Sequence, residues 1–118
     1  MTLNEYQDKA METCMPSCEN FSYMMLNLVG EVGEFASKVA KAIRKGKADI
    51  MYSEMVVKLG DNDNLLPELQ AEAGDILWQL SGLCTMMGWS LEQVAQANLD
   101  KLASRKERGV IDGNGDNR

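Results

Sequence analysis

The stretch Gly30-Glu31-Val32-Gly33-Glu34 places two acids three residues apart in the middle of a long segment with helical periodicity. Residues at this spacing lie on neighbouring turns of one helix face. The apolar residues around the stretch recur at intervals of three and four, so they form one stripe, with Glu31 at its edge and Glu34 just beyond. Because an unpaired charge is costly to bury, the two acids require a partner or a metal ion. The stripe consists of Phe21, Met24, Leu28, Val32, Phe35, Val39 and Ile43.

A second pair of acids, Glu72 and Asp75, lies in the next long helical segment, one turn after Glu68. Either pair alone is more often a solvated helix face, so the prediction depends on the combination. Two helices that each bury an apolar stripe can pack antiparallel, which would bring the four acids together. Hard divalent cations such as Mg²⁺ prefer oxygen ligands of this kind. The second stripe consists of Leu65, Leu69, Ala73, Ile76, Leu80, Leu83 and Met87.

Composition limits the class of protein. A chain of 118 residues favours one domain, and its net charge of −6 argues against a nucleic-acid-binding surface. No apolar run is long enough to span a membrane and no signal peptide is visible, so neither membrane nor nucleic acid is expected as a partner. The cysteines Cys14, Cys18 and Cys84 fit free thiols in a reducing, cytoplasmic setting.

The periodicity predicts an all-α fold, a bundle of four helices around one core. Thr2 with Glu5 forms a capping-box pattern, and Ser90 with Gln93 forms another. We read residues 1–108 as the domain and 109–118 as a flexible C-terminal tail, either a disordered end or a lid over a bound triphosphate. The expected helices cover residues 3–14, 20 or 21 to 45, 65–87 and 91–106, with a shorter one at 49–59 in the connector 46–64 and a turn cluster at 60–64.

Cationic residues accompany the acids. Lys38 and Lys41 continue the row of the first acid pair, and Asn98, Lys101 and Arg105 share one face of the last helix. One interpretation is a polar residue that fixes helix register beside two solvated cations. The other is a set of cations and an amide aimed at an anion that the metal holds. A carboxylate cluster next to cations is what a metal–phosphate substrate requires.

These motifs together resemble the MazG-type nucleoside triphosphate pyrophosphohydrolases of the all-α NTP pyrophosphatase superfamily. The resemblance covers about residues 20–108, although the segment between the two acid pairs is longer than is usual in the family. It implies Mg²⁺-dependent cleavage, with Mn²⁺ as a substitute, of an NTP or dNTP into a nucleoside monophosphate and pyrophosphate. It further implies that the four acids bind metal and that Asn98, Lys101 and Arg105 contact the nucleotide. The motifs are Glu31-x-x-Glu34, Glu72-x-x-Asp75 within Ala-Glu-Ala-Gly-Asp-Ile-Leu-Trp, and Asn98-x-x-Lys101.

We therefore expect a homodimeric or homotetrameric hydrolase in which a metal-activated water attacks the triphosphate. Because the chain has no histidine, a carboxylate must serve as general base. The expected catalytic residues are Glu31, Glu34 and Glu68, with Glu68 either acting as the base or supporting the ligands. The alternative is a non-catalytic helical adaptor or nucleotide sensor that keeps the fold.

Overall fold

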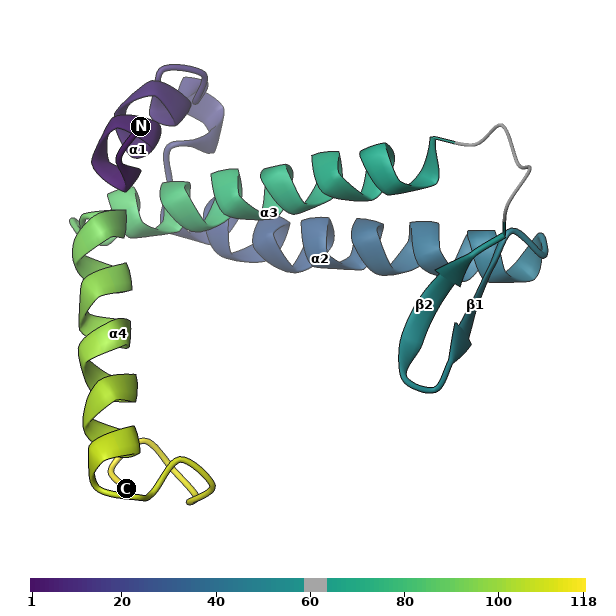
Figure 1. Cartoon of the computed structure of the whole chain (residues 1–118). Coiled ribbons are helices and arrows are strands. Elements are labelled where there is room, and N and C mark those ends of the chain that lie inside the picture. Colours follow the sequence, from purple (N-terminus) through teal and green to yellow (C-terminus); the bar gives the residue numbers. More distant parts are fainter. Residues whose placement is uncertain (59–63) are drawn as a thin grey trace.

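The computed structural model describes residues 1–58 and 64–118 of the chain, and within them helices dominate (Figure 1). Two long helices lie side by side, and shorter elements attach to both ends of this pair. This confirms the expected all-α class, with a small hairpin added. The elements are α1 (Leu3–Met11), the 3₁₀ turn η1 (Pro16–Cys18), α2 (Phe21–Arg44), β1 (Ala48–Met51), β2 (Glu54–Val57), α3 (Leu65–Met86) and α4 (Leu91–Glu107).

Local sequence sets the helix ends. The Thr2 hydroxyl accepts a hydrogen bond from the backbone N–H of Glu5, whose own side chain closes the capping box. Ser90 caps α4 by accepting from the N–H of Gln93 at 3.3 Å. Gly46, just past α2, has a φ of +72°, which glycine adopts without strain. These ends confirm the predicted helices, although α1 stops at Met11 instead of residue 14.

The connector holds a hairpin, so the short helix predicted at 49–59 is wrong where the structure describes it. β1 and β2 pair antiparallel, with Ala48 opposite Val57. The turn residues Tyr52 and Ser53 have φ values of +52° and +67°, as in a two-residue hairpin turn. Methionines four residues apart suggested a helix, but the β-branched residues of both strands favour extended backbone. The end of that predicted helix and most of the turn cluster after it lie outside the described residues.

The antiparallel pair α2–α3 buries a seam that differs from the predicted stripes. In α3 the seam residues alternate steps of four and three, and two of them are polar: Glu72 and Gln79 are 8% and 3% exposed. The predicted stripe residue Val32 is instead 49% exposed, and Ala73 is exposed as well. Polar side chains therefore occupy core positions of this helix pair. The α3 seam consists of Leu65, Leu69, Glu72, Ile76, Gln79 and Leu83, and the α2 seam of Met24, Leu28, Glu31, Phe35, Lys38 and Ala42.

The glycines of α2 and α3 differ in how tightly they are packed. Met24 is fully buried, and a Cβ placed on Gly82 would collide with its sulfur atom. A Cβ on Gly33 or Gly74 would meet no atom within 4 Å. Intrachain helix packing therefore explains Gly82 and does not explain the glycines beside the acids, which leave open space next to Glu34 and Asp75.

The shorter elements give the chain an open shape. The hairpin packs Ala48 against the core residues Leu65 and Leu69 at one end of the helix pair. At the other end α1 covers α3, where the indole of Trp78 donates to the Ala10 carbonyl at 3.0 Å. α4 leaves this end at a steep angle to α3 (Figure 1). The radius of gyration is 17.8 Å, whereas a compact domain of this length has about 13.5 Å.

No helix in residues 1–58 or 64–118 combines the length and the hydropathy needed to cross a membrane.

Candidate metal centre

Three acids meet where the middle of α2 faces the middle of α3. Glu31 comes from α2, and Glu72 and Asp75 come from neighbouring turns of α3; one carboxylate oxygen from each lies within 4.8 Å of the others. Burial decreases across the group, from Glu72, which is buried, through Glu31 to Asp75, which is exposed. The group therefore opens from the helix seam toward solvent, and a ligand can reach it.

Two oxygens of this group have no hydrogen-bond partner among the described residues. Both Glu31 Oε2 and Glu72 Oε2 are buried, and leaving a buried acceptor unpaired costs about 1–3 kcal/mol. A divalent cation would remove this cost, because carboxylate oxygens are the ligands that Mg²⁺ and Mn²⁺ prefer. The residues present therefore fit a hard divalent cation.

The other oxygen of each glutamate is held by a neighbouring side chain. The amide of Asn27 donates to Glu31 Oε1 at 3.2 Å, and Lys38 Nζ lies 3.0 Å from Glu72 Oε1. Each carboxylate is thus oriented through one oxygen while the second stays free, as second partners orient ligands in metal sites. Sequence reasoning did not assign Asn27, although its position four residues before Glu31 was a usable signal.

The electrostatics of the group are those of crowded negative charge. Burial is the largest cause that raises the pKa of Glu31 above its ordinary value. The nearby carboxylates of Glu34, Asp75 and Glu72 raise this pKa further, and the hydrogen bond from Asn27 partly offsets the rise. Bringing these acids together without a cation therefore costs free energy, which a bound cation would recover.

The other two predicted acids lie beside the group. Glu34 is exposed one turn after Glu31 and is close enough to influence the pKa of Glu31. Glu68 is exposed one turn before Glu72 and lines a cavity together with lysines. The structure thus joins three of the four predicted metal ligands directly and places Glu34 next to them.

Comparison with known families agrees with this geometry. The family model of the MazG nucleotide pyrophosphohydrolase domain matches residues 19–110. The chain belongs to this family. It is also 39% identical to the Gene 37 protein of Mycobacterium phage L5, in an alignment of 125 residues that spans all of both proteins, but that name states no activity. No solved structure matches the chain.

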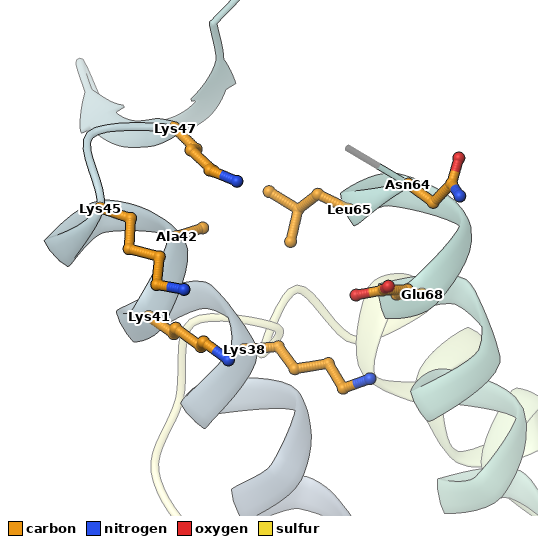
Figure 2. Close-up of a pocket in the computed structure, with 8 residues that line it drawn as sticks. All are labelled: Lys38, Lys41, Ala42, Lys45, Lys47, Asn64, Leu65 and Glu68. Carbon is orange, nitrogen blue, oxygen red and sulfur yellow. The ribbon is translucent and has the colours of Figure 1, made fainter. Parts of the chain in front are cut away.

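Membership of the MazG family indicates nucleotide pyrophosphohydrolase activity in general. Of the predicted substrate contacts, Lys38 contacts the acid Glu72, and Lys38 and Lys41 both line the cavity at the end of α2 (Figure 2). The hydrogen bond to the Glu72 carboxylate raises the pKa of Lys38. Lys38 therefore links the acids to this cavity.

The three α4 residues of the MazG-like motif lie apart from the acids within one chain. Asn98 and Lys101 of α4 line a cavity of about 460 Å³ together with Trp89, which precedes the helix. Arg105 is 5% exposed and donates to the backbone carbonyl of Asp116 at 3.1 Å. The described contacts of Asn98, Lys101 and Arg105 include none with the acid group, and α4 points away from the α2–α3 pair (Figure 1).

The C-terminal residues fold back on the end of α4. Arg118 Nε donates to the Val110 carbonyl at 3.0 Å, and Arg108 donates to the carbonyl of Arg118 at 2.7 Å. Lys101 Nζ lies 3.9 Å from Asp116 Oδ1. The segment 109–118, expected to be flexible, therefore makes specific hydrogen bonds in the structure, and its role as a lid stays a prediction.

The metal-free protein should become more stable when one charge leaves the group. Glu31→Gln should raise the free energy of unfolding at about pH 7–8 by an amount on the order of 1 kcal/mol, because it removes like-charge repulsion and burial of a charge. A raised carboxyl pKa means that the folded wild type loses stability as pH rises through that pKa. The gain should therefore be smaller at about pH 5, which is closer to the ordinary pKa range of carboxyl groups.

Urea unfolding in EDTA at both pH values measures this difference. Adding Mg²⁺ should stabilise the wild type and leave Glu31→Gln little changed. Glu12→Gln, an exposed acid outside the group, is the matched control. A loss of stability in metal-free Glu31→Gln at neutral pH would show that the carboxylate is held by favourable contacts within the fold.

Proposed function

We propose that this protein is a Mg²⁺-dependent pyrophosphohydrolase, which also accepts Mn²⁺ and cleaves an NTP or dNTP between its α- and β-phosphates. The products are a nucleoside monophosphate and pyrophosphate. The observation that carries the proposal is the pair of buried oxygens on Glu31 and Glu72 that have no hydrogen-bond partner within the described part of the chain, inside a three-acid group of a MazG domain. We propose Glu31, Glu72 and Asp75 as the cation ligands.

The bound cation would polarise the phosphate oxygens and activate the attacking water. Glu34 lies outside the group of three, is exposed, and stands one turn from Glu31. We propose that its carboxylate accepts the proton of the water that attacks the α-phosphorus. Glu68, the other candidate base, lines the lysine cavity one turn before Glu72 and is not a member of the three-acid group.

The nucleotide would be held by the cationic side chains and the Asn98 amide already described. Lys38 and Lys41 lie on the acid side of the molecule, whereas Asn98, Lys101 and Arg105 lie on α4. We propose that the α4 residues reach the nucleotide when a second copy of the chain packs against the first.

The three free cysteines fit a protein that acts in the reducing cytoplasm.

The exposed face of α2 supports assembly into a homodimer or homotetramer. Leu26 and Val29 are 75% and 65% exposed, and Met25 and Val32 extend the same apolar surface. Contiguous exposed apolar surface of this kind marks an interaction site. The open shape of the chain and the empty space beside Gly33 also suit close approach by a second helix.

Product analysis tests the proposed reaction. Incubation with Mg²⁺ and each common NTP and dNTP should yield a nucleoside monophosphate and pyrophosphate, resolved by ion-exchange chromatography. Glu72→Gln should reduce turnover by about 10²-fold or more, because the cation loses a buried ligand. A diphosphate with inorganic phosphate would contradict the mechanism, and no turnover on any nucleotide would favour the nucleotide-binding adaptor or sensor.

Glu34→Gln separates the roles of the acids. It should keep most of the Mg²⁺-dependent stabilisation yet lower kcat by about 10²–10⁴-fold, the usual contribution of a general base. Equal losses of Mg²⁺ binding in Glu34→Gln and Glu72→Gln would instead make Glu34 a ligand. Glu107→Gln, an exposed acid at the end of α4, provides a control that should retain wild-type turnover.

Sedimentation or light scattering tests the assembly. The wild type should be a dimer or tetramer, and Val29→Glu should shift it toward monomers, because a buried unpaired carboxylate costs several kcal/mol in an apolar interface. Ile111→Glu, which changes an exposed apolar residue outside the α2 surface, should leave the assembly intact. A monomeric wild type would contradict the proposal.

A further inference from the structure

A cavity of about 300 Å³ lies between the end of α2 and the start of α3. Figure 2 shows lysine side chains extending into it from the α2 side, with Glu68 facing them from α3. Four cations and one acid thus line a single cavity in a chain whose net charge is −6. The lining residues are Lys38, Lys41, Ala42, Lys45, Lys47, Asn64, Leu65 and Glu68.

Helix chemistry accounts for only part of this cluster. Cations near a helix C-terminus interact favourably with its macrodipole, which would suit Lys41 and Lys45 at the end of α2. Lys38 lies a turn earlier and Lys47 follows the helix, yet both line the same cavity. Within the described ranges Lys41 and Lys45 have no carboxylate within ion-pair distance. Lys41 and Lys45 therefore bring positive charge to the cavity that the described carboxylates do not neutralise, which favours an anion there.

The start of α3 adds a second attraction for anions. Asn64 stands at the N-cap of this 22-residue helix, but its side chain makes no capping hydrogen bond. The backbone N–H groups of Leu65 and Leu66 therefore donate no hydrogen bond to the Asn64 side chain, and the positive end of the α3 macrodipole adds to the attraction for an anion. Asn64 and Leu65 both line the cavity, so this helix end and the lysines face the same space.

Lys38 connects the cavity to the metal centre. Its ammonium lies 3.0 Å from Glu72 Oε1, and its side chain also lines the cavity. A polyanion held by the cation at one end can therefore extend directly toward the lysines. A nucleoside triphosphate has this shape, because its β- and γ-phosphates lead away from the bond that is cut.

We infer that the cavity binds the β- and γ-phosphates of the substrate and then the pyrophosphate product. This inference rests on the proposed function. When the water oxygen bonds to the α-phosphorus, the bridging P–O bond breaks, and its electron pair stays on the oxygen that leaves with the β-phosphorus. The proton of the water passes to Glu34, and the lysine ammonium groups neutralise the charge that grows on the leaving pyrophosphate.

Pyrophosphate binding tests the inference directly. The affinity for pyrophosphate can be measured by calorimetry in the presence of Mg²⁺ and as the inhibition constant during turnover. By both measures it should weaken by about fivefold in Lys41→Ala and in Lys45→Ala. Lys45→Arg should retain most of the affinity, because it keeps the cation. Inhibition by the nucleoside monophosphate should stay within about twofold of wild type, since that product lacks the β- and γ-phosphates.

Lys106→Ala is the matched control, because Lys106 also lies in the last turn of a helix but outside this cavity. It should leave pyrophosphate affinity unchanged, and thermal unfolding should show that all variants fold. Unchanged pyrophosphate affinity in both cavity variants would overturn the inference, as would an equal loss of monophosphate affinity. Calorimetry needs no turnover, so a failure here is distinguishable from a failure of the proposed reaction.

Discussion

The carboxylates of Glu31 and Glu72 in the seam between α2 and α3 are the constraint on which the rest of the site depends. A helix pair of this length would be more stable with apolar side chains at these positions, because burial of an apolar side chain is favourable, whereas burial of a charge is costly. Asn27 and Lys38 each take up one carboxylate oxygen and leave the other unpaired. This arrangement is that of a cation-binding site.

Three kinds of surface lie around the site: the acid group, the lysine cavity, and the exposed faces of α2 and α4. From the three acids, Lys38 leads to the lysine cavity at one end of the helix pair. The apolar surface of α2 and the residues of α4 are the surfaces that we propose contact a second copy of the chain. The metal centre thus requires only α2 and α3, whereas the proposed nucleotide site requires contributions from several surfaces. An open chain with a radius of gyration of 17.8 Å suits such an arrangement.

The sequence predicted the four helices well, because their caps and periodicity are short-range patterns. The expectation that acids from the two long helices meet depended in addition on the assumption that these helices pack antiparallel. Caps such as Thr2 and Ser90 act locally, and acids three residues apart lie on the same face of a helix wherever that helix packs. The hairpin was missed because a methionine repeat outweighed the β-branched residues of its strands. The seam was misplaced because hydrophobicity assigned Ala73 to it and could not assign Glu72 and Gln79, which the structure buries.

Apart from the packing of the two long helices, the sequence did not predict contacts between distant segments. The cavity between Lys45 and Asn64 exists only because α3 returns along α2, and the Arg105–Asp116 contact exists only because the tail folds back. In a single chain α4 lies away from the acids, so the proposed grouping of Asn98 with the acids needs a second copy, which one sequence does not specify.

The most direct test of the account is a crystal structure of the protein soaked in Mn²⁺, with data collected at a wavelength where manganese scatters anomalously. We predict an anomalous peak bound by the carboxylates of Glu31, Glu72 and Asp75, including the Oε2 atoms of Glu31 and Glu72, which have no hydrogen-bond partner among the described residues. A map with no peak between α2 and α3, or with manganese bound only at surface acids elsewhere, would contradict the claim that the buried carboxylates hold a cation.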